Sequence, residues 1–196
     1  MVGLVTMDVL EFLYDYFEDR AHAAALIRQR RPYALGVLGA LLGGISLFAA
    51  EALASRLMFL SFSVPALLLV LLWQLTVLFA STAVLHLLLD MTGARGDSGA
   101  LFVHLGLSEL AWLAVVPAVL VVQAAFPDRA WPVRLAFAAV GLWSAALKAR
   151  GMRDEYGVGE GRAWLTLGAP CVALAALLAL SATLALVALI VKALSS

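Results

Sequence analysis

Four ionisable residues stand inside or at the ends of long apolar stretches, and they are the strongest candidates for chemistry in this chain. They are His86, Asp90, His104 and Glu109. Because an ionisable group in hydrocarbon is costly, each is by default a functional hypothesis. His86 and Asp90 are four residues apart and would share a helix face. His104 and Glu109 lie on the next apolar stretch, with Glu109 about 7 Å deeper. We expect the four side chains to form one intramembrane polar cluster.

Several kinds of site fit such a cluster. It could bind a metal through His86, His104 and a carboxylate, serve a small transporter or an ion or proton pathway, or bind a lipid headgroup. A hydrogen-bonded cluster that only holds two helices together is the structural alternative. His86 is followed by Leu-Leu-Leu-Asp rather than by the glutamate of a zinc-hydrolase motif, and no nucleophile-elbow motif surrounds Ser81 or Ser108. We therefore expect a protein that is not an enzyme and needs no metal or other cofactor.

The elements that must position these residues are five apolar stretches, each long enough to cross a bilayer. They cover residues 33–53, 64–89, 101–125, 133–149 and 164–191. About 20 helical residues span a hydrocarbon core of ~30 Å. Hydrophobic residues make up 64% of the 196 residues, whereas roughly 45–50% is usual in soluble domains. The sequence predicts an all-α polytopic membrane protein, with a transmembrane domain over residues 33–196 in contact with membrane lipids.

Residues 1–32 are predicted to form an amphipathic helix followed by a basic linker. Acidic residues recur at helical spacing on one face, and aromatic and aliphatic residues fill the other. Two interpretations stay open: an interfacial helix whose aromatic side chains enter the headgroup region, or a docking helix for a protein partner at the cytoplasmic face. The docking residues would be Asp8, Glu11, Phe12, Asp15 and Tyr16.

The formal net charge is zero, which gives no reason to expect a nucleic-acid partner. The basic residues are nevertheless distributed unevenly between the two sides of the predicted membrane path. One side of a five-span path would carry Arg28, Arg30, Arg31, Arg95, Lys148, Arg150, Arg153 and Arg162, and the other Arg56, Arg129, Arg134 and Lys192. The positive-inside rule then places the N-terminus in the cytoplasm and the C-terminus outside. The composition, rich in alanine and poor in lysine, indicates a bacterial gene and hence the bacterial inner membrane.

Small residues on the first span predict a close helix contact. They are Gly36, Gly39, Ala40, Gly43 and Gly44. Such residues let two backbones approach in lipid, where the hydrophobic effect does not press helices together. We expect this ridge to pack within one chain, while a homo-oligomer stays open. Pro117 and Pro170 should kink the third and fifth spans.

Two stretches resemble the Yip (Ypt-interacting protein) domain family. They are residues 85–98, Leu-His-Leu-Leu-Leu-Asp-Met-Thr-Gly-Ala-Arg-Gly-Asp-Ser, and the segment from Leu142-Trp-Ser-Ala-Ala-Leu-Lys148 to Gly161-Arg-Ala-Trp164. The matched positions are His86, Gly93, Arg95, Gly96, Arg162 and Ala163. The family has glycine where this chain has Ala94. The resemblance implies a bacterial membrane scaffold or adaptor. It does not carry over the GTPase binding of eukaryotic members, because the N-terminal region is short.

Overall fold

The computed structural model describes residues 9–18, 20–54, 63–127 and 129–195, and every regular element in these ranges is a helix. The elements are α1 (Val9–Glu18), α2 (Arg20–Arg30), α3 (Tyr33–Leu53), α4 (Val64–Met91), α5 (Ser98–Ser108), the 3-10 helix η1 (Glu109–Ala114), α6 (Val115–Ala125), α7 (Ala130–Tyr156) and α8 (Glu160–Ser195). Five helical runs are long and apolar enough to cross a membrane: α3, α4, α5–η1–α6, α7 and α8. The predicted all-α membrane fold is confirmed.

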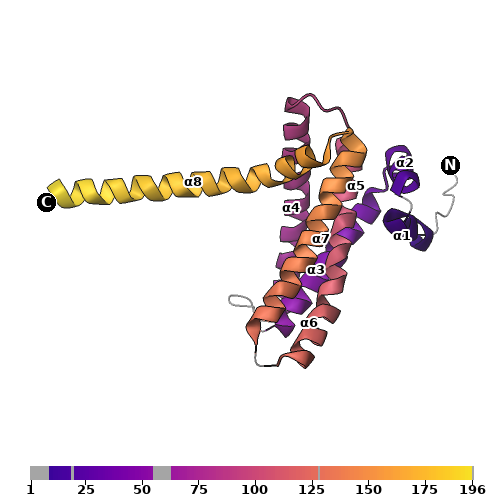
Figure 1. Ribbon diagram of the computed structural model, residues 1–196, viewed down its shortest axis with the longest axis horizontal. Coiled ribbons are helices and arrows are strands. Elements are labelled where there is room, and N and C mark those ends of the chain that lie inside the picture. The colour runs from indigo at the N-terminus through magenta and orange to yellow at the C-terminus, as the bar shows by residue number, and fades with distance from the viewer. Residues whose placement is uncertain (1–8, 19, 55–62, 128, 196) are drawn as a thin grey trace.

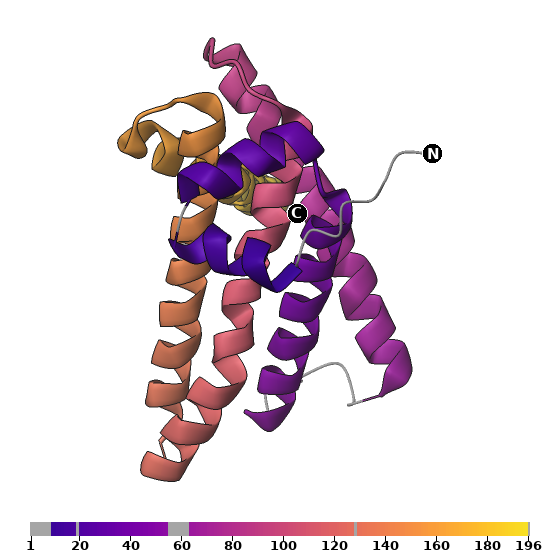
Figure 2. The ribbon, with the colours of Figure 1, turned by 90° about the vertical axis from the view of Figure 1, so that its right-hand side faces the viewer.

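The centre of the bundle is α5. α3, α4, α7 and the α5–η1–α6 run lie side by side along one direction (Figures 1 and 2). Every residue from Ala100 to Glu109 is buried, on all sides of the helix. A helix that is apolar and covered all round must lie between several neighbours. Because α5 has this position, its side chains contact different helices in different directions.

The predicted small-residue ridge of α3 faces α5 within the chain. A Cβ atom added at Gly39 would lie 2.6 Å from the Gly106 carbonyl oxygen, and one added at Gly43 would overlap the Glu109 carbonyl oxygen. Gly36 packs on the backbone of Val103, while Gly44 lies against α4. Gly106 of α5 lies opposite Gly36 of α3, so both helices have glycine at the contact. The two backbones can therefore approach closely, which gives the van der Waals packing that holds helices together in lipid.

The third span is broken in the middle by η1. Pro117 has no N–H, and its ring disfavours α-helical geometry around the carbonyl of Leu113, so the turns before it tighten into a 3-10 helix. Ser46 of α3 donates a hydrogen bond of 2.8 Å to the Trp112 carbonyl oxygen in this segment. The proline thus changes the direction in which residues after Ser108 point.

α7 is longer than the predicted fourth span, residues 133–149. It begins at Ala130 and runs through a charged segment to Tyr156, where Gly157 adopts a positive φ of 63° and ends it. Hydropathy detects only the apolar part of such a helix. The charged last turns are also helical, so the helix extends beyond the predicted span. α7 therefore has ample length to cross the bilayer.

The N-terminal helices α1 and α2 pack on the bundle, across α5 and α7 (Figure 2). Phe12 and Tyr16 are buried, and so are Ala23 and Ile27 of α2. Burying one such aromatic side chain stabilises by about 2 kcal/mol, so Phe12 and Tyr16, two of the predicted docking residues, contribute to packing within the chain. Asp15 is half-buried and lies 3.7 Å from His22. Asp8 and the Glu11 side chain lie outside the described part of the chain.

α8 differs from the other apolar helices because a long part of it is exposed. It continues as a helix through Pro170 and then extends away from the bundle, across the direction of the other helices (Figure 1). Each residue from Cys171 to Ala185 is exposed. The structure thus combines a packed core with a helix whose apolar surface is available to lipid.

Candidate functional site

A groove of about 880 Å³ lies between α3, α4 and α5. α4 contributes one helix face to its wall, as the spacing of the lining residues shows. These residues are Phe79, Thr82, Ala83, His86, Leu87 and Asp90. The other walls are formed by Arg31, Tyr33 and Val37 before and on α3, and by Asp97, Ser98, Gly99 and Phe102 at the start of α5. Since α3 and α5 begin at the end of the bundle where α4 finishes, the polar residues of all three helices gather at that end.

The inner part of the groove is apolar and partly aromatic. The rings of Phe79 and Phe102 face each other with centroids 4.9 Å apart, and the Tyr33 ring lies 6.1 Å from Phe102. Val37 and Leu87 extend this wall. Cavities that bind small molecules are commonly apolar with a few polar groups that fix orientation. The groove has this division: its charged groups and His86 lie towards one end, while the Thr82 hydroxyl, nearer Phe79, donates to the Leu78 carbonyl oxygen of its own helix.

The polar end of the groove is organised by Asp97. Its carboxylate caps α5 by accepting hydrogen bonds from the backbone N–H groups of Gly99 and Ala100, at 2.6 and 3.3 Å. The same carboxylate forms an ion pair with Arg31. Arg31 has a φ of 44°, in a region that residues other than glycine rarely adopt. The sharp turn between α2 and α3 thus brings the guanidinium to the groove.

His86 and Asp90 complete the polar end. The His86 Nδ1 atom lies 2.6 Å from the Tyr156 hydroxyl oxygen, so the imidazole is held by α7. Asp90 is exposed, and among the described residues its carboxylate has no hydrogen bond or ion pair. The end of the groove therefore has one neutralised pair, one imidazole held in place, and one carboxylate whose charge is uncompensated.

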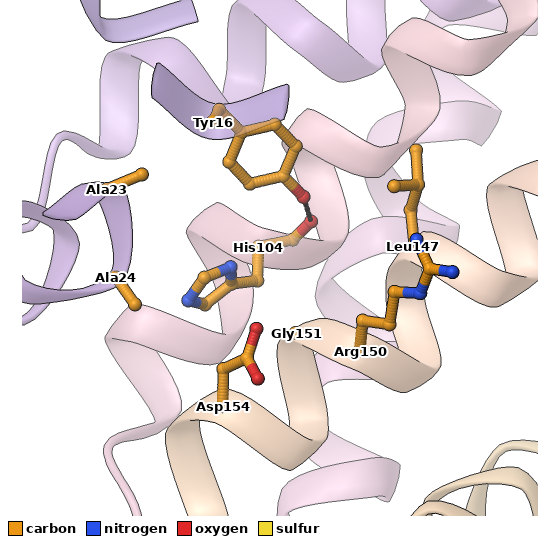
Figure 3. A pocket seen from close by; sticks show the side chains of 8 residues that line it. All are labelled: Tyr16, Ala23, Ala24, His104, Leu147, Arg150, Gly151 and Asp154. Atoms are coloured by element: carbon orange, nitrogen blue, oxygen red, sulfur yellow. Dashed lines mark hydrogen bonds between the residues drawn. The ribbon is translucent and has the colours of Figure 1, made fainter. Parts of the chain in front are cut away.

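His104 lies elsewhere, in a cavity of about 20 Å³ under α1 and α2. Figure 3 shows its ring beside the Asp154 carboxylate, while the Tyr16 hydroxyl donates to the His104 carbonyl oxygen at 3.3 Å. His104 is only 3% exposed, and within the described structure neither ring nitrogen has a hydrogen-bond partner. A Cβ atom added at Gly151 would lie 2.8 Å from the His104 Cβ. The cavity has room for about one water molecule but for no larger ligand.

Glu109 lies in a third place, a groove between α4, α7 and α8. Its Oε1 atom is 2.6 Å from the Lys148 Nζ atom, and the Glu109 side chain is 9% exposed. A buried charge needs such a partner, because the cost of removing it from water is otherwise several kcal/mol. Glu109 is thus part of an ion pair between η1 and α7.

The four predicted cluster residues are therefore not brought together. His86 and Asp90 share the large groove, whereas His104 and Glu109 each line another cavity. Five residues of helix separate the last two, and this spacing turns their side chains to different sides of the helix. The described residues contain no group of three or more His, Cys, Asp or Glu side chains that could hold a metal ion.

The loop residues on which the predicted resemblance rests lie between α4 and α5 and at the start of α8. Gly93 has a positive φ of 78°, and Gly96 faces the Tyr156 ring with no room for a Cβ atom. Arg162 donates a hydrogen bond of 2.5 Å to the Thr92 carbonyl oxygen, while Ala163 is buried and Arg95 is exposed. These residues fix the α4–α5 loop against α7 and α8.

No sequence pattern singles out Glu155. Its carboxylate accepts a hydrogen bond of 2.9 Å from Arg28 and another of 3.0 Å from the backbone N–H of Asp97. It thereby ties α2 and the start of α5 to α7. No local pattern identifies such contacts between distant segments. The Asp-Ser-Gly-Ala sequence at residues 97–100, however, is a helix-start signal that could have identified Asp97.

Comparisons of the chain with models of protein families, with curated proteins and with solved structures gave no match.

Proposed function

We propose that this protein is an integral membrane protein that binds a membrane lipid in the groove between α3, α4 and α5, without catalysing a reaction. The observation that supports this proposal best is the division of the groove into an apolar, aromatic part and a polar end. A phospholipid has the same division. Its acyl chains would lie along Phe79 and Phe102, and its headgroup would lie among Arg31, His86 and Asp90.

The position of the groove along the bundle supports a lipid rather than a water-soluble ligand. Its polar end is built at the starts of α3 and α5 and the end of α4, where a spanning helix meets the headgroup region. Its apolar part lies within the length of the same helices. A bilayer lipid can enter from the side without leaving its normal depth, which keeps the cost of binding low.

In this proposal the groove opens at the cytoplasmic side of a bacterial inner membrane, as the distribution of basic residues predicts. Membrane lipids are the partners that the function needs.

The proposal is tested by substituting one groove residue and its neighbour. Ala83 lines the groove, whereas Val84 follows it on α4 and lines the separate α4–α7–α8 groove. Both are exposed, so a tryptophan can be accommodated at either position. Native mass spectrometry of full-length protein released from bilayer nanodiscs should show a retained lipid in the wild type and in Val84→Trp. Ala83→Trp should lose it, because the ring fills the groove.

Equal lipid retention in Ala83→Trp and Val84→Trp would contradict the proposal. A thermal unfolding curve for each variant in detergent serves as the control for folding.

A second candidate function is a membrane scaffold or adaptor, as the resemblance to Yip-domain proteins implies. It is favoured by exposed basic residues at the same end of the bundle. Arg30 and Arg95 have no ion pair among the described residues, so they could meet an acidic surface of a cytoplasmic protein. A photo-crosslinking amino acid at position 95 should then give one protein adduct in cells, and Arg30→Glu should remove it. If position 95 gives only lipid adducts, the adaptor role is excluded.

A further inference from the structure

We infer that the groove selects a zwitterionic phospholipid whose headgroup places a primary ammonium beyond a phosphate, as in phosphatidylethanolamine. This inference rests on the proposed function and adds the class of headgroup. Three observations carry it: the uncompensated carboxylate of Asp90, the donors on Arg31 and His86, and the order of these groups along α4.

The polar end of the groove has a formal charge of one negative unit and therefore favours a bound cation. Arg31 and Asp97 form an ion pair, so their formal charges cancel. Asp90 then leaves one negative charge, and within the described structure no basic side chain pairs with it. A primary ammonium can donate hydrogen bonds to this carboxylate, and charge-assisted bonds of this kind are stronger than neutral ones. A quaternary ammonium has no N–H to donate.

Donors for a phosphate lie on the other side of the same end. Tyr156 needs one acceptor for its hydroxyl proton, and His86 Nδ1, 2.6 Å away, can be that acceptor. The proton of the neutral imidazole then resides on Nε2, which becomes a hydrogen-bond donor. Arg31 uses part of its guanidinium for Asp97 and has further N–H donors. Two donors of this type suit a phosphate.

The order of these groups along α4 matches the order of groups in the lipid. Phe79 comes first, His86 two turns later, and Asp90 one further turn towards the end of the helix, about 6 Å beyond His86. From the inside outwards the groove thus offers an apolar wall, a donor for phosphate, and an acceptor for a cation. Acyl chain, phosphate and ammonium follow one another in the same sequence. A headgroup with a net negative charge would bring no cation to Asp90.

The test is a competition between lipid headgroups in the intact protein. Nanodiscs would contain equal amounts of phosphatidylethanolamine, phosphatidylglycerol and phosphatidylcholine, and native mass spectrometry would measure which lipid the protein retains. Asp90→Asn keeps the shape of the side chain and removes its charge. The control is Glu160→Gln, which removes an exposed carboxylate that lies at the start of α8 and not in the groove.

We expect the wild type and Glu160→Gln to prefer phosphatidylethanolamine by about fivefold, the size that a single partly exposed ion pair gives. Asp90→Asn should bind the three lipids nearly equally. A wild-type preference for phosphatidylglycerol or phosphatidylcholine, or an unchanged preference in Asp90→Asn, would overturn the headgroup inference. If Ala83→Trp still removes the retained lipid in that case, the proposed function stands. If Ala83→Trp retains as much lipid as Val84→Trp, the groove is not the site and both proposals fall.

Discussion

The α3–α5 contact and the α4–α8 surface use apolar residues in opposite ways. Along α5 every residue from Ala100 to Ser108 is buried, and glycines on both helices let the backbones meet. Along α4 and α8 many large aliphatic side chains are exposed; Leu72 is 63% exposed and Leu177 also 63%. Hydropathy is similar in the two regions. What separates them is side-chain size at the contact, because helices in lipid associate through close packing rather than through hydrophobicity.

This difference explains why the candidate site lies where it does. The α3–α5 pair is a rigid frame, and α4 leans on it with one face only. The groove runs along the face of α4 that carries Phe79, His86 and Asp90, between this helix and the starts of α3 and α5. A site of this kind has one wall in the packed bundle and one wall on a helix with a large exposed apolar surface, which suits a ligand that comes from the bilayer.

The largest expected effect comes from the ion pair at the edge of the packed region. Lys148→Met should lower the free energy of unfolding by about 3 kcal/mol, because it leaves the Glu109 carboxylate buried without its partner. Unfolding by sodium dodecyl sulphate in mixed micelles measures this change. The double variant Lys148→Met/Glu109→Gln should recover most of the loss. If the double variant is no more stable than Lys148→Met, the ion pair does not explain the burial of Glu109.

The same glycine substitution should act differently in the two regions. Gly106→Ala should lower stability by about 2 kcal/mol, because the new Cβ atom overlaps the Gly36 carbonyl oxygen. In α8, a Cβ atom at Gly168 meets nothing within 4 Å. Gly168→Ala should therefore raise stability by about 0.5–1 kcal/mol through helix propensity. Equal effects of the two variants in the same unfolding assay would show that the α3–α5 contact is not the packed frame.

Replacement of His104 tests whether its burial without hydrogen-bond partners lowers the stability of the protein. Its two ring nitrogens have no hydrogen-bond partner among the described residues. His104→Leu should therefore raise the unfolding free energy by about 1 kcal/mol, since it removes polar atoms that are buried without partners. A loss of stability would mean that the imidazole makes a hydrogen bond through bound water.

The smallest effect is expected on the exposed helix. Leu177→Ala removes an apolar side chain that is 63% exposed in the described structure. Its effect on unfolding should stay below about 0.5 kcal/mol. A loss of more than about 2 kcal/mol in mixed micelles would indicate that α8 packs against protein, in this chain or in a second copy.

The sequence predicted most of the fold and only half of the polar cluster. The five spans were located because apolar length alone marks a membrane helix, and the residues of the glycine ridge were found because small residues mark close contacts. His86 and Asp90 were correctly placed on one face because four-residue spacing is local information. Their separation from His104 and Glu109 was not predicted. A helix that is apolar all round gives no periodic signal of which face meets which neighbour.

The remaining contacts depend on how distant segments meet. Arg31 reaches Asp97 because the chain turns at a strained residue, and Tyr156 reaches His86 because α7 continues beyond its apolar part. The N-terminal helix was expected either at the interface or on a partner. Its aromatic residues Phe12 and Tyr16 instead pack on the bundle, an option that amphipathicity cannot distinguish from the other two.

The position of a bound lipid tests the central claim most directly. Full-length protein in nanodiscs would be irradiated with a phospholipid that carries a diazirine in its acyl chain, and the adducts would be mapped by peptide sequencing. We predict adducts concentrated at the groove residues Phe79, Ala83 and Phe102, with several times less at the outward residues Leu72 and Leu177. Uniform labelling of the groove and the outward residues would contradict a lipid site between α3, α4 and α5.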